Sequence, residues 1–135
     1  TLSLHDALPI FSGGNLLPES NPDHDAWGNS LEYAFNLDPL RGDGLAGSAG
    51  GGAPQVTLVP AGPGGLLEVS FLRRKSATSG LTYAVEFSSD LNAWEGTDAL
   101  VVTPVDGEWE RVTVRDSVGS AGLRRFAHVA VTLVR

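Results

Sequence analysis

The sequence predicts a mainly β protein, in which an antiparallel β-sandwich follows a short loop and helix. Three observations lead to this fold class. Apolar and polar residues alternate with period two over much of the second half of the chain, turn-forming residues separate these runs, and no helical periodicity lies between them. Six short runs within roughly eighty residues favour antiparallel pairing, and two packed sheets would bury their apolar faces.

Composition excludes several classes of protein. The chain has 135 residues, a formal net charge of −7 and 41% hydrophobic residues, which is enough for a core. Nucleic-acid binding is not expected, because it requires clustered Lys and Arg to neutralise phosphates. The chain has no Cys, which excludes disulfides and thiolate metal sites. No apolar run is long enough to span a membrane.

Four segments are distinguished in chain order. Residues 1–10, TLSLHDALPI, match the translation of a common sequencing-library adapter, so we treat them as an artefact and expect the natural protein to begin further upstream. Residues 11–40 contain an acidic loop and a short helix. Residues 41–54 are Gly-rich and predict a flexible linker, so that the loop and helix should unfold separately from the sandwich. Residues 55–135 form the β-sandwich module.

The acidic loop predicts a calcium site. Residues 21–32 read NPDHDAWGNSLE, with oxygen-bearing side chains at loop positions one, three, five, nine and twelve. This spacing is that of an EF-hand-like calcium loop, in which alternate residues converge on one hard cation and position seven supplies a backbone carbonyl. The predicted ligands are Asn21, Asp23, Asp25, the carbonyl of Trp27, Asn29 and Glu32.

Two positions of the loop depart from the pattern. Position six is normally Gly because its φ is positive, and here it is Ala26. Position four is His24, where a small or turn-forming residue would fit more easily. We therefore expect weak binding of Ca²⁺. The alternative is an acidic turn that caps a helix and binds no ion.

A short helix should follow the loop. Its apolar face should comprise Leu31, Ala34 and Phe35, which have the i, i+3, i+4 spacing of a helix face. Asn29 or Ser30 is the expected N-cap.

The period-two runs predict the strands in order. Gln55–Val59 and Ala99–Thr103 are rich in β-branched residues. In the other four runs alternate apolar residues define one face: Leu67, Val69 and Phe71; Tyr83, Val85 and Phe87; Val112 and Val114; and Val129, Val131 and Leu133. The core should contain Phe71, Val85, Phe87, Val114 and Val131. Short strands at this spacing are typical of immunoglobulin-like and fibronectin III-like sandwiches.

Other polar residues are given structural roles. Ser89 or Asp90 should bond turn amides after the strand that ends near position 88. His128 should lie solvated on the polar face of the last strand. Residues 73–75, Arg-Arg-Lys, should keep a turn in water.

Two parts of the chain resemble a known family. NPDHDAWGNSLEYAFNLDP resembles a calcium-binding segment near the C-terminus of many large exported bacterial proteins, notably from Verrucomicrobia and Planctomycetes, which is similar to single thrombospondin type 3 and dockerin-like repeats. Residues 83–94 and 124–133 resemble the β-rich module that often follows it. The resemblance implies a secreted or cell-surface protein with an upstream domain in the same polypeptide. It also implies calcium ligation by Asn21, Asp23, Asp25, Asn29 and Glu32.

The expected function is non-catalytic. The chain should be a calcium-stabilised C-terminal accessory module for surface display, adhesion or domain spacing, and no nucleophile elbow or carboxylate pair indicates an enzyme. The alternative is a carbohydrate-binding module of a secreted hydrolase, with a polysaccharide or cell-surface ligand. Its stacking platform would be formed by Trp27, Tyr83, Trp94 and Trp109. Coplanar exposed aromatic rings would favour this alternative, and packed rings would favour structural roles.

Overall fold

The structure is a computed structural model that describes residues 20–24, 27–37, 52–75, 79–97, 100–119 and 124–133. Residues 1–10, which were interpreted from the sequence as a translated adapter, lie outside the described residues. The described elements are one helix segment, α2 (Asn29–Phe35), and a set of strands. The strands are β1 (Gln55–Val59), β2 (Leu66–Arg74), β3 (Leu81–Ser88), β4 (Glu95–Gly96), β5 (Leu100–Pro104), β6 (Trp109–Arg115) and β7 (Phe126–Leu133).

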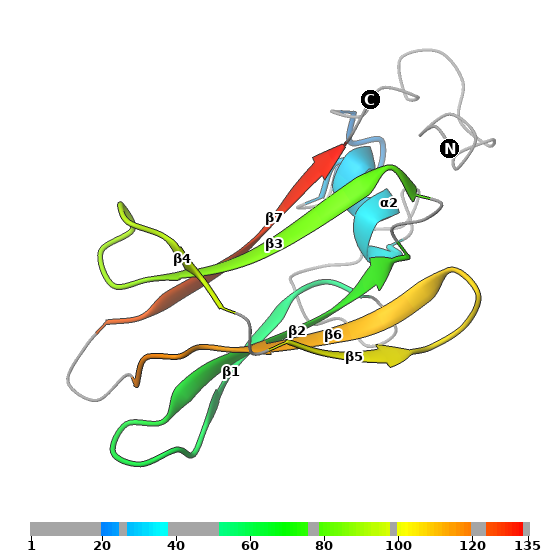
Figure 1. The fold of residues 1–135 in the computed structure, drawn as a ribbon. Coiled ribbons are helices and arrows are strands. Elements are labelled where there is room, and N and C mark those ends of the chain that lie inside the picture. Colours follow the sequence, from blue (N-terminus) through cyan, green and yellow to red (C-terminus); the bar gives the residue numbers. More distant parts are fainter. Residues whose placement is uncertain are drawn as a thin grey trace.

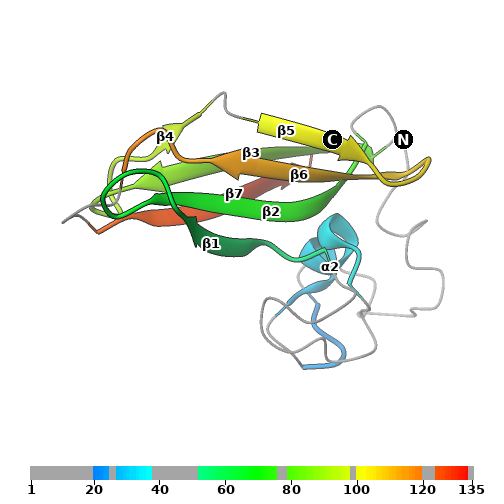
Figure 2. The same cartoon turned by 90° about the horizontal axis from the view of Figure 1, so that it is seen from below.

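The strands form two antiparallel sheets in a sandwich-like arrangement (Figure 1). The four-stranded sheet has the order β1-β2-β6-β5, and the three-stranded sheet has the order β4-β3-β7. Figure 2 shows the four-stranded sheet toward the viewer, with β3 and β7 behind it. The predicted mainly β, antiparallel fold is therefore confirmed. The structure adds the two-residue strand β4, which is too short to show an alternating pattern.

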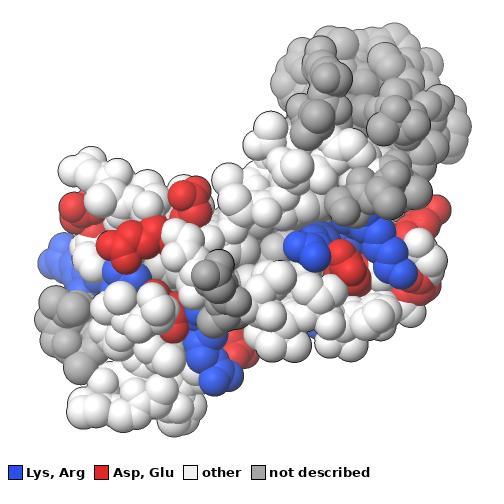
Figure 3. All heavy atoms as spheres, in the orientation of Figure 1, with Lys and Arg blue, Asp and Glu red and all other residues white. Residues whose placement is uncertain are grey.

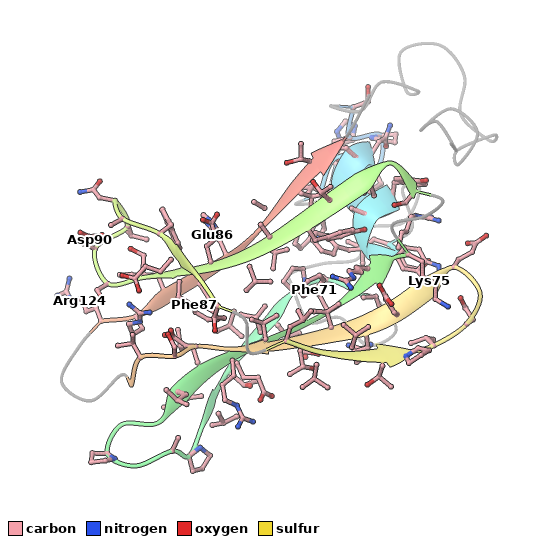
Figure 4. The ribbon with its side chains drawn as sticks, viewed as in Figure 1. Phe71, Lys75, Glu86, Phe87, Asp90 and Arg124 are labelled. Atoms are coloured by element: carbon pink, nitrogen blue, oxygen red, sulfur yellow. The ribbon has the colours of Figure 1, made fainter. Side chains whose placement is uncertain are left out.

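The hydrophobic core lies between the two sheets. Phe71, Phe87 and Val114 are buried, as predicted from the alternation. In Figure 4, Phe71 and Phe87 point into the space between the sheets. Val85 and Val131 are only partly buried, although they pack against the same core. Both lie on the three-stranded sheet, and Val85 also lines the cavity between the sheets.

Helix α2 belongs to this core and is not a separate unit. Tyr33, Ala34 and Phe35 are buried and join the hydrophobic cluster formed by the sheets. The Tyr83 hydroxyl on β3 donates a hydrogen bond to the Ala34 carbonyl oxygen at 2.7 Å. Arg74, at the end of β2, donates from Nε to the Tyr33 carbonyl oxygen at 2.9 Å. These contacts join α2 to the sandwich, so we now expect the helix to unfold together with the sheets.

The end of the predicted linker is also built into the fold. The Gly52 amide donates to the Phe35 carbonyl oxygen at 2.9 Å, and its carbonyl oxygen accepts from the Leu72 amide at 3.0 Å. A Cβ on Gly52 would collide with both the Phe35 carbonyl oxygen and the Leu72 side chain. Glycine is required here because the backbones of α2 and β2 approach too closely for any side chain. The rest of the predicted linker, through residue 51, lies outside the described residues.

Two details of the helix differ from the prediction. Its N-cap is Gly28, not Asn29 or Ser30, and no side chain caps it. Leu31 is 36% exposed, whereas Phe35, one turn later, is buried. The difference arises because the sheets contact the C-terminal turn of the helix, while Leu31 lies toward the loop.

Arg74 has a different role from the one predicted for this basic run. Its guanidinium group lies over the rings of Tyr33 and Trp109, 3.9 Å and 4.3 Å from their centroids. The side chain is 16% exposed and approaches Glu108 at 3.6 Å. Arg74 therefore holds the helix against the four-stranded sheet, and its main role is not to keep a turn in water.

Candidate functional site

The predicted calcium loop is closed by backbone hydrogen bonds. The Asn29 amide donates to the Ser20 carbonyl oxygen at 2.8 Å, and the His24 amide donates to the Asn21 carbonyl oxygen at 3.3 Å. His24 has φ +61°, in the left-handed region that non-Gly residues adopt infrequently. The loop therefore turns sharply at position four, where the sequence pattern indicated that a turn-forming residue would fit better.

The predicted ligand oxygens in the described part of the loop are buried. Almost no accessible surface remains on Asn21 Oδ1, Asp23 Oδ2, Asn29 Oδ1 and both carboxylate oxygens of Glu32. Glu32 and Asn29 are 0% exposed. Burial of a carboxylate costs several kcal/mol of hydration free energy, which nearby positive charge or donors must offset. Carboxylate and amide oxygens are the ligands that Ca²⁺ prefers, so these residues fit a hard cation.

Part of the predicted site lies outside the described residues. Asp25, at position five, and Ala26, at position six, belong to that part. Within the described ranges, no group of three or more His, Asp or Glu residues is arranged to hold a metal ion. The described loop contributes only two carboxylates to the predicted set, those of Asp23 and Glu32.

Trp27, at position seven, connects the loop to the core. Its ring meets the Phe35 ring edge-on, with centroids 6.3 Å apart. Phe35 in turn packs edge-on against Phe71 and Tyr83, with centroids 6.0 Å and 6.1 Å apart. A continuous set of aromatic contacts therefore runs from the loop through α2 to both sheets.

The four aromatic residues considered for a sugar-stacking platform do not share one surface. Trp27 and Tyr83 pack against the core near α2, and Trp109 is buried at the start of β6. Trp94 stacks on His128 of β7, with ring centroids 3.7 Å apart. His128 was predicted to be solvated, but it is only half-exposed, and its Nε2 lies 3.1 Å from the Glu86 carboxylate. The rings thus have packing roles in different parts of the fold.

The corner between β3 and β4 has the predicted turn chemistry. Asp90 Oδ1 accepts hydrogen bonds from the Ala93 and Asn92 amides at 3.0 Å and 2.9 Å. These hydrogen bonds, that from Ala93 first, lower the pKa of the Asp90 carboxyl. Ser89 does not bond a turn amide in this way; it accepts a hydrogen bond from Arg125 Nη1 at 2.8 Å.

A buried ion pair between Asp116 and Arg125 was not predicted. Arg125 donates from Nε and Nη2 to the two Asp116 carboxylate oxygens, each at 2.8 Å. The side chains are 2% and 3% exposed, and the hydrogen bond to Asp116 raises the pKa of Arg125. No spacing rule could predict the pair, because it depends on how β6 and β7 are placed in the fold. The pair joins the residue that follows β6 to the residue that precedes β7.

A cavity of about 530 Å³ lies between the sheets on the side of β3 and β5. Its apolar lining includes Phe71, Tyr83 and Leu100. Two charged residues also line it: Arg73, which forms an ion pair with Glu110 at 2.8 Å, and Glu86, whose Oε1 lies 3.1 Å from His128 Nε2. The cavity therefore has a mixed apolar and polar lining.

Charges of both signs alternate on the face shown in Figure 3, where Lys and Arg lie beside Asp and Glu. Within the described ranges, no helix has the length and apolar character needed to cross a membrane. Comparison with protein-family models, with curated proteins and with solved structures found no match for this chain.

Proposed function

We propose that this chain is a non-catalytic accessory module of a larger exported protein, and that calcium binding to residues 21–32 stabilises it. The observation that supports this most directly is the burial of the Asn21, Asp23, Asn29 and Glu32 oxygens in one closed loop. Surface display, adhesion or spacing of an upstream domain would then be the role of the module.

Calcium would be held by the six groups that the loop spacing predicts. They are the side chains of Asn21, Asp23, Asp25, Asn29 and Glu32 and the carbonyl oxygen of Trp27. The ion would supply positive charge next to carboxylates that the fold has removed from water. Glu32 directly precedes Tyr33, so a ligand bond at Glu32 would act on the residues that dock the helix.

The strand order supports an immunoglobulin-like or fibronectin III-like module. In immunoglobulin domains one sheet has the order A-B-E-D, and the other contains C and F as neighbours, with C′ beside C in some domains. The orders β1-β2-β6-β5 and β4-β3-β7 correspond to A-B-E-D and C′-C-F.

Calorimetric titration with CaCl₂, together with thermal unfolding, tests this proposal on the full chain. The native protein should release or absorb heat saturably, and it should gain about 2.7 kcal/mol of unfolding free energy at a calcium concentration one hundred times Kd. Glu32→Gln should abolish both effects, because it removes the charge of the ligand expected to bind through two oxygens. The matched control is Glu108→Gln, which changes an exposed carboxylate far along the sequence.

Two results would count against the proposal. The first is no heat with millimolar calcium and no change in amide exchange over residues 21–37. The second is equal binding by the native protein and Glu32→Gln.

A further inference from the structure

The ring of Phe35 joins the proposed calcium loop to both sheets. Trp27, whose carbonyl oxygen is a predicted ligand, meets the Phe35 ring edge-on at a centroid distance of 6.3 Å. Phe35 in turn meets Phe71 of the four-stranded sheet at 6.0 Å and Tyr83 of the three-stranded sheet at 6.1 Å. Phe35 is 2% exposed. The position of its ring therefore depends on the loop and on both sheets together.

The proposed ligands come from two parts of the chain whose relation must be fixed. Asn21 and Asp23 belong to the loop, whereas Glu32 belongs to α2. Glu32 is the ligand expected to bind through two oxygens, so a change in the orientation of the helix moves both oxygens relative to the loop. Helix α2 has seven residues, and isolated helices shorter than about 12–15 residues are only marginally stable in water. Tertiary contacts must therefore hold Glu32 in place.

The sheets supply these contacts at the last turn of the helix. In Figure 1, α2 lies beside the end of β2 and the start of β3. Phe71 and Tyr83 stack on each other with ring centroids 5.9 Å apart, and both contact the ring of Phe35. The Tyr83 hydroxyl donates to the Ala34 carbonyl oxygen at 2.7 Å and accepts from the Arg74 amide at 3.2 Å. Ring contacts and a hydrogen bond thus fix the turn that follows Glu32.

We propose that Phe35 is a positioning residue of the calcium site, supported by Tyr83, so that packing of the helix on the sheets sets the affinity of the loop for Ca²⁺. This inference rests on the proposed calcium binding and adds residues outside the loop that control it. If the helix were docked in one tenth of the molecules, apparent binding would be about tenfold weaker, because only the docked fraction holds Glu32 in place. Linkage is reciprocal, so calcium in turn stabilises the contacts of Phe35 with the sheets.

Phe35→Leu and Phe87→Leu form a matched pair for calorimetric titration of the full chain with CaCl₂. Each removes an aromatic ring from the same hydrophobic cluster, at sites that are 2% and 1% exposed. Phe87 lies toward the β4 end of β3, away from α2 (Figure 4). The titrations are made at a temperature where both variants are folded, so a loss of stability by itself does not change the Kd of the folded protein. Phe35→Leu should raise Kd about threefold or more, and Phe87→Leu should keep the native Kd.

Tyr83→Phe is a milder second variant, because it keeps the ring and removes only the hydroxyl that is bonded to Ala34. It should raise Kd about twofold or more, and it decides the question if Phe35→Leu does not fold. Amide hydrogen exchange gives the reciprocal measurement. Saturating calcium should slow exchange near Phe71 in β2 and near Tyr83 in β3 of the native protein, and it should do so less in Phe35→Leu.

The outcomes separate this inference from the proposed function. Equal Kd values for Phe35→Leu and Phe87→Leu, or calcium protection confined to residues 20–37, would overturn the positioning role while calcium binding itself stood. If Phe35→Leu were unfolded, a native Kd in Tyr83→Phe would overturn the role in the same way. No heat from the native protein with millimolar calcium would overturn the proposed calcium binding, and the positioning role with it.

Discussion

Replacing Phe35 by Ala would measure how strongly helix α2 is joined to the sandwich. Phe35 is 2% exposed, and its ring meets those of Trp27, Phe71 and Tyr83 at centroid distances of 6.3, 6.0 and 6.1 Å. Removing a buried Phe ring costs about 3–5 kcal/mol, because transfer energy is lost and a cavity is left behind. Since two of its partners lie on the sheets, the loss should fall on the unfolding of the whole module. At roughly 4 °C per kcal/mol for a domain of this size, Tm should fall by about 12–20 °C.

Thermal and urea unfolding, followed by far-ultraviolet circular dichroism and by tryptophan fluorescence, would measure this loss. Trp94 and Trp109 report on the sandwich, and the two signals should change in one coincident transition. Leu31→Ala is the control on the same helix, and its partly exposed side chain should cost less than about 1 kcal/mol. If the sandwich of Phe35→Ala unfolded at the native midpoint while helical signal was lost, the helix would be a separate unit and the reasoning would be refuted.

Two further changes test other parts of the structure. Asp116→Ala should lower the unfolding free energy, measured by urea titration, by about 3–5 kcal/mol, because it leaves the buried Arg125 guanidinium without its carboxylate. A loss of unfolding free energy below about 1 kcal/mol would show that the ion pair is dispensable. Burial raises the pKa of Tyr83 from 10.0 to about 12. As the pH rises, the hydroxyl therefore loses its proton in the unfolded chain before it does so in the folded protein. The contribution of Tyr83 to the unfolding free energy should be fully present below pH 10 and should be lost between pH 10 and 12. Tyr83→Phe loses the hydrogen bond to Ala34, which should lower the unfolding free energy by about 1 kcal/mol. Its urea midpoint should fall less steeply between pH 10 and 12 than that of the native protein. An equally steep fall of the midpoint in both proteins would contradict this assignment.

The sequence by itself determined the strands and the spacing of the calcium loop. Alternation of apolar and polar residues is a local property, because successive side chains of a strand point to opposite faces whatever the strand later pairs with. That is why Phe71, Phe87 and Val114 could be placed in the core before any contact was known. Ligand spacing in residues 21–32 is local in the same sense, and the structure buries the oxygens of four predicted positions.

Only the tertiary structure decided how these parts join. A Gly-rich composition predicts freedom of the backbone, but Gly52 is fixed because α2 and β2 meet there at too short a distance for a side chain. Arg74 was predicted to be a solvated turn residue, but the fold places its guanidinium group over the rings of Tyr33 and Trp109. The pairing of β7 with β3 likewise depends on which strands become neighbours. Each of these features depends on residues far apart in the chain, and local periodicity carries no information about such pairs.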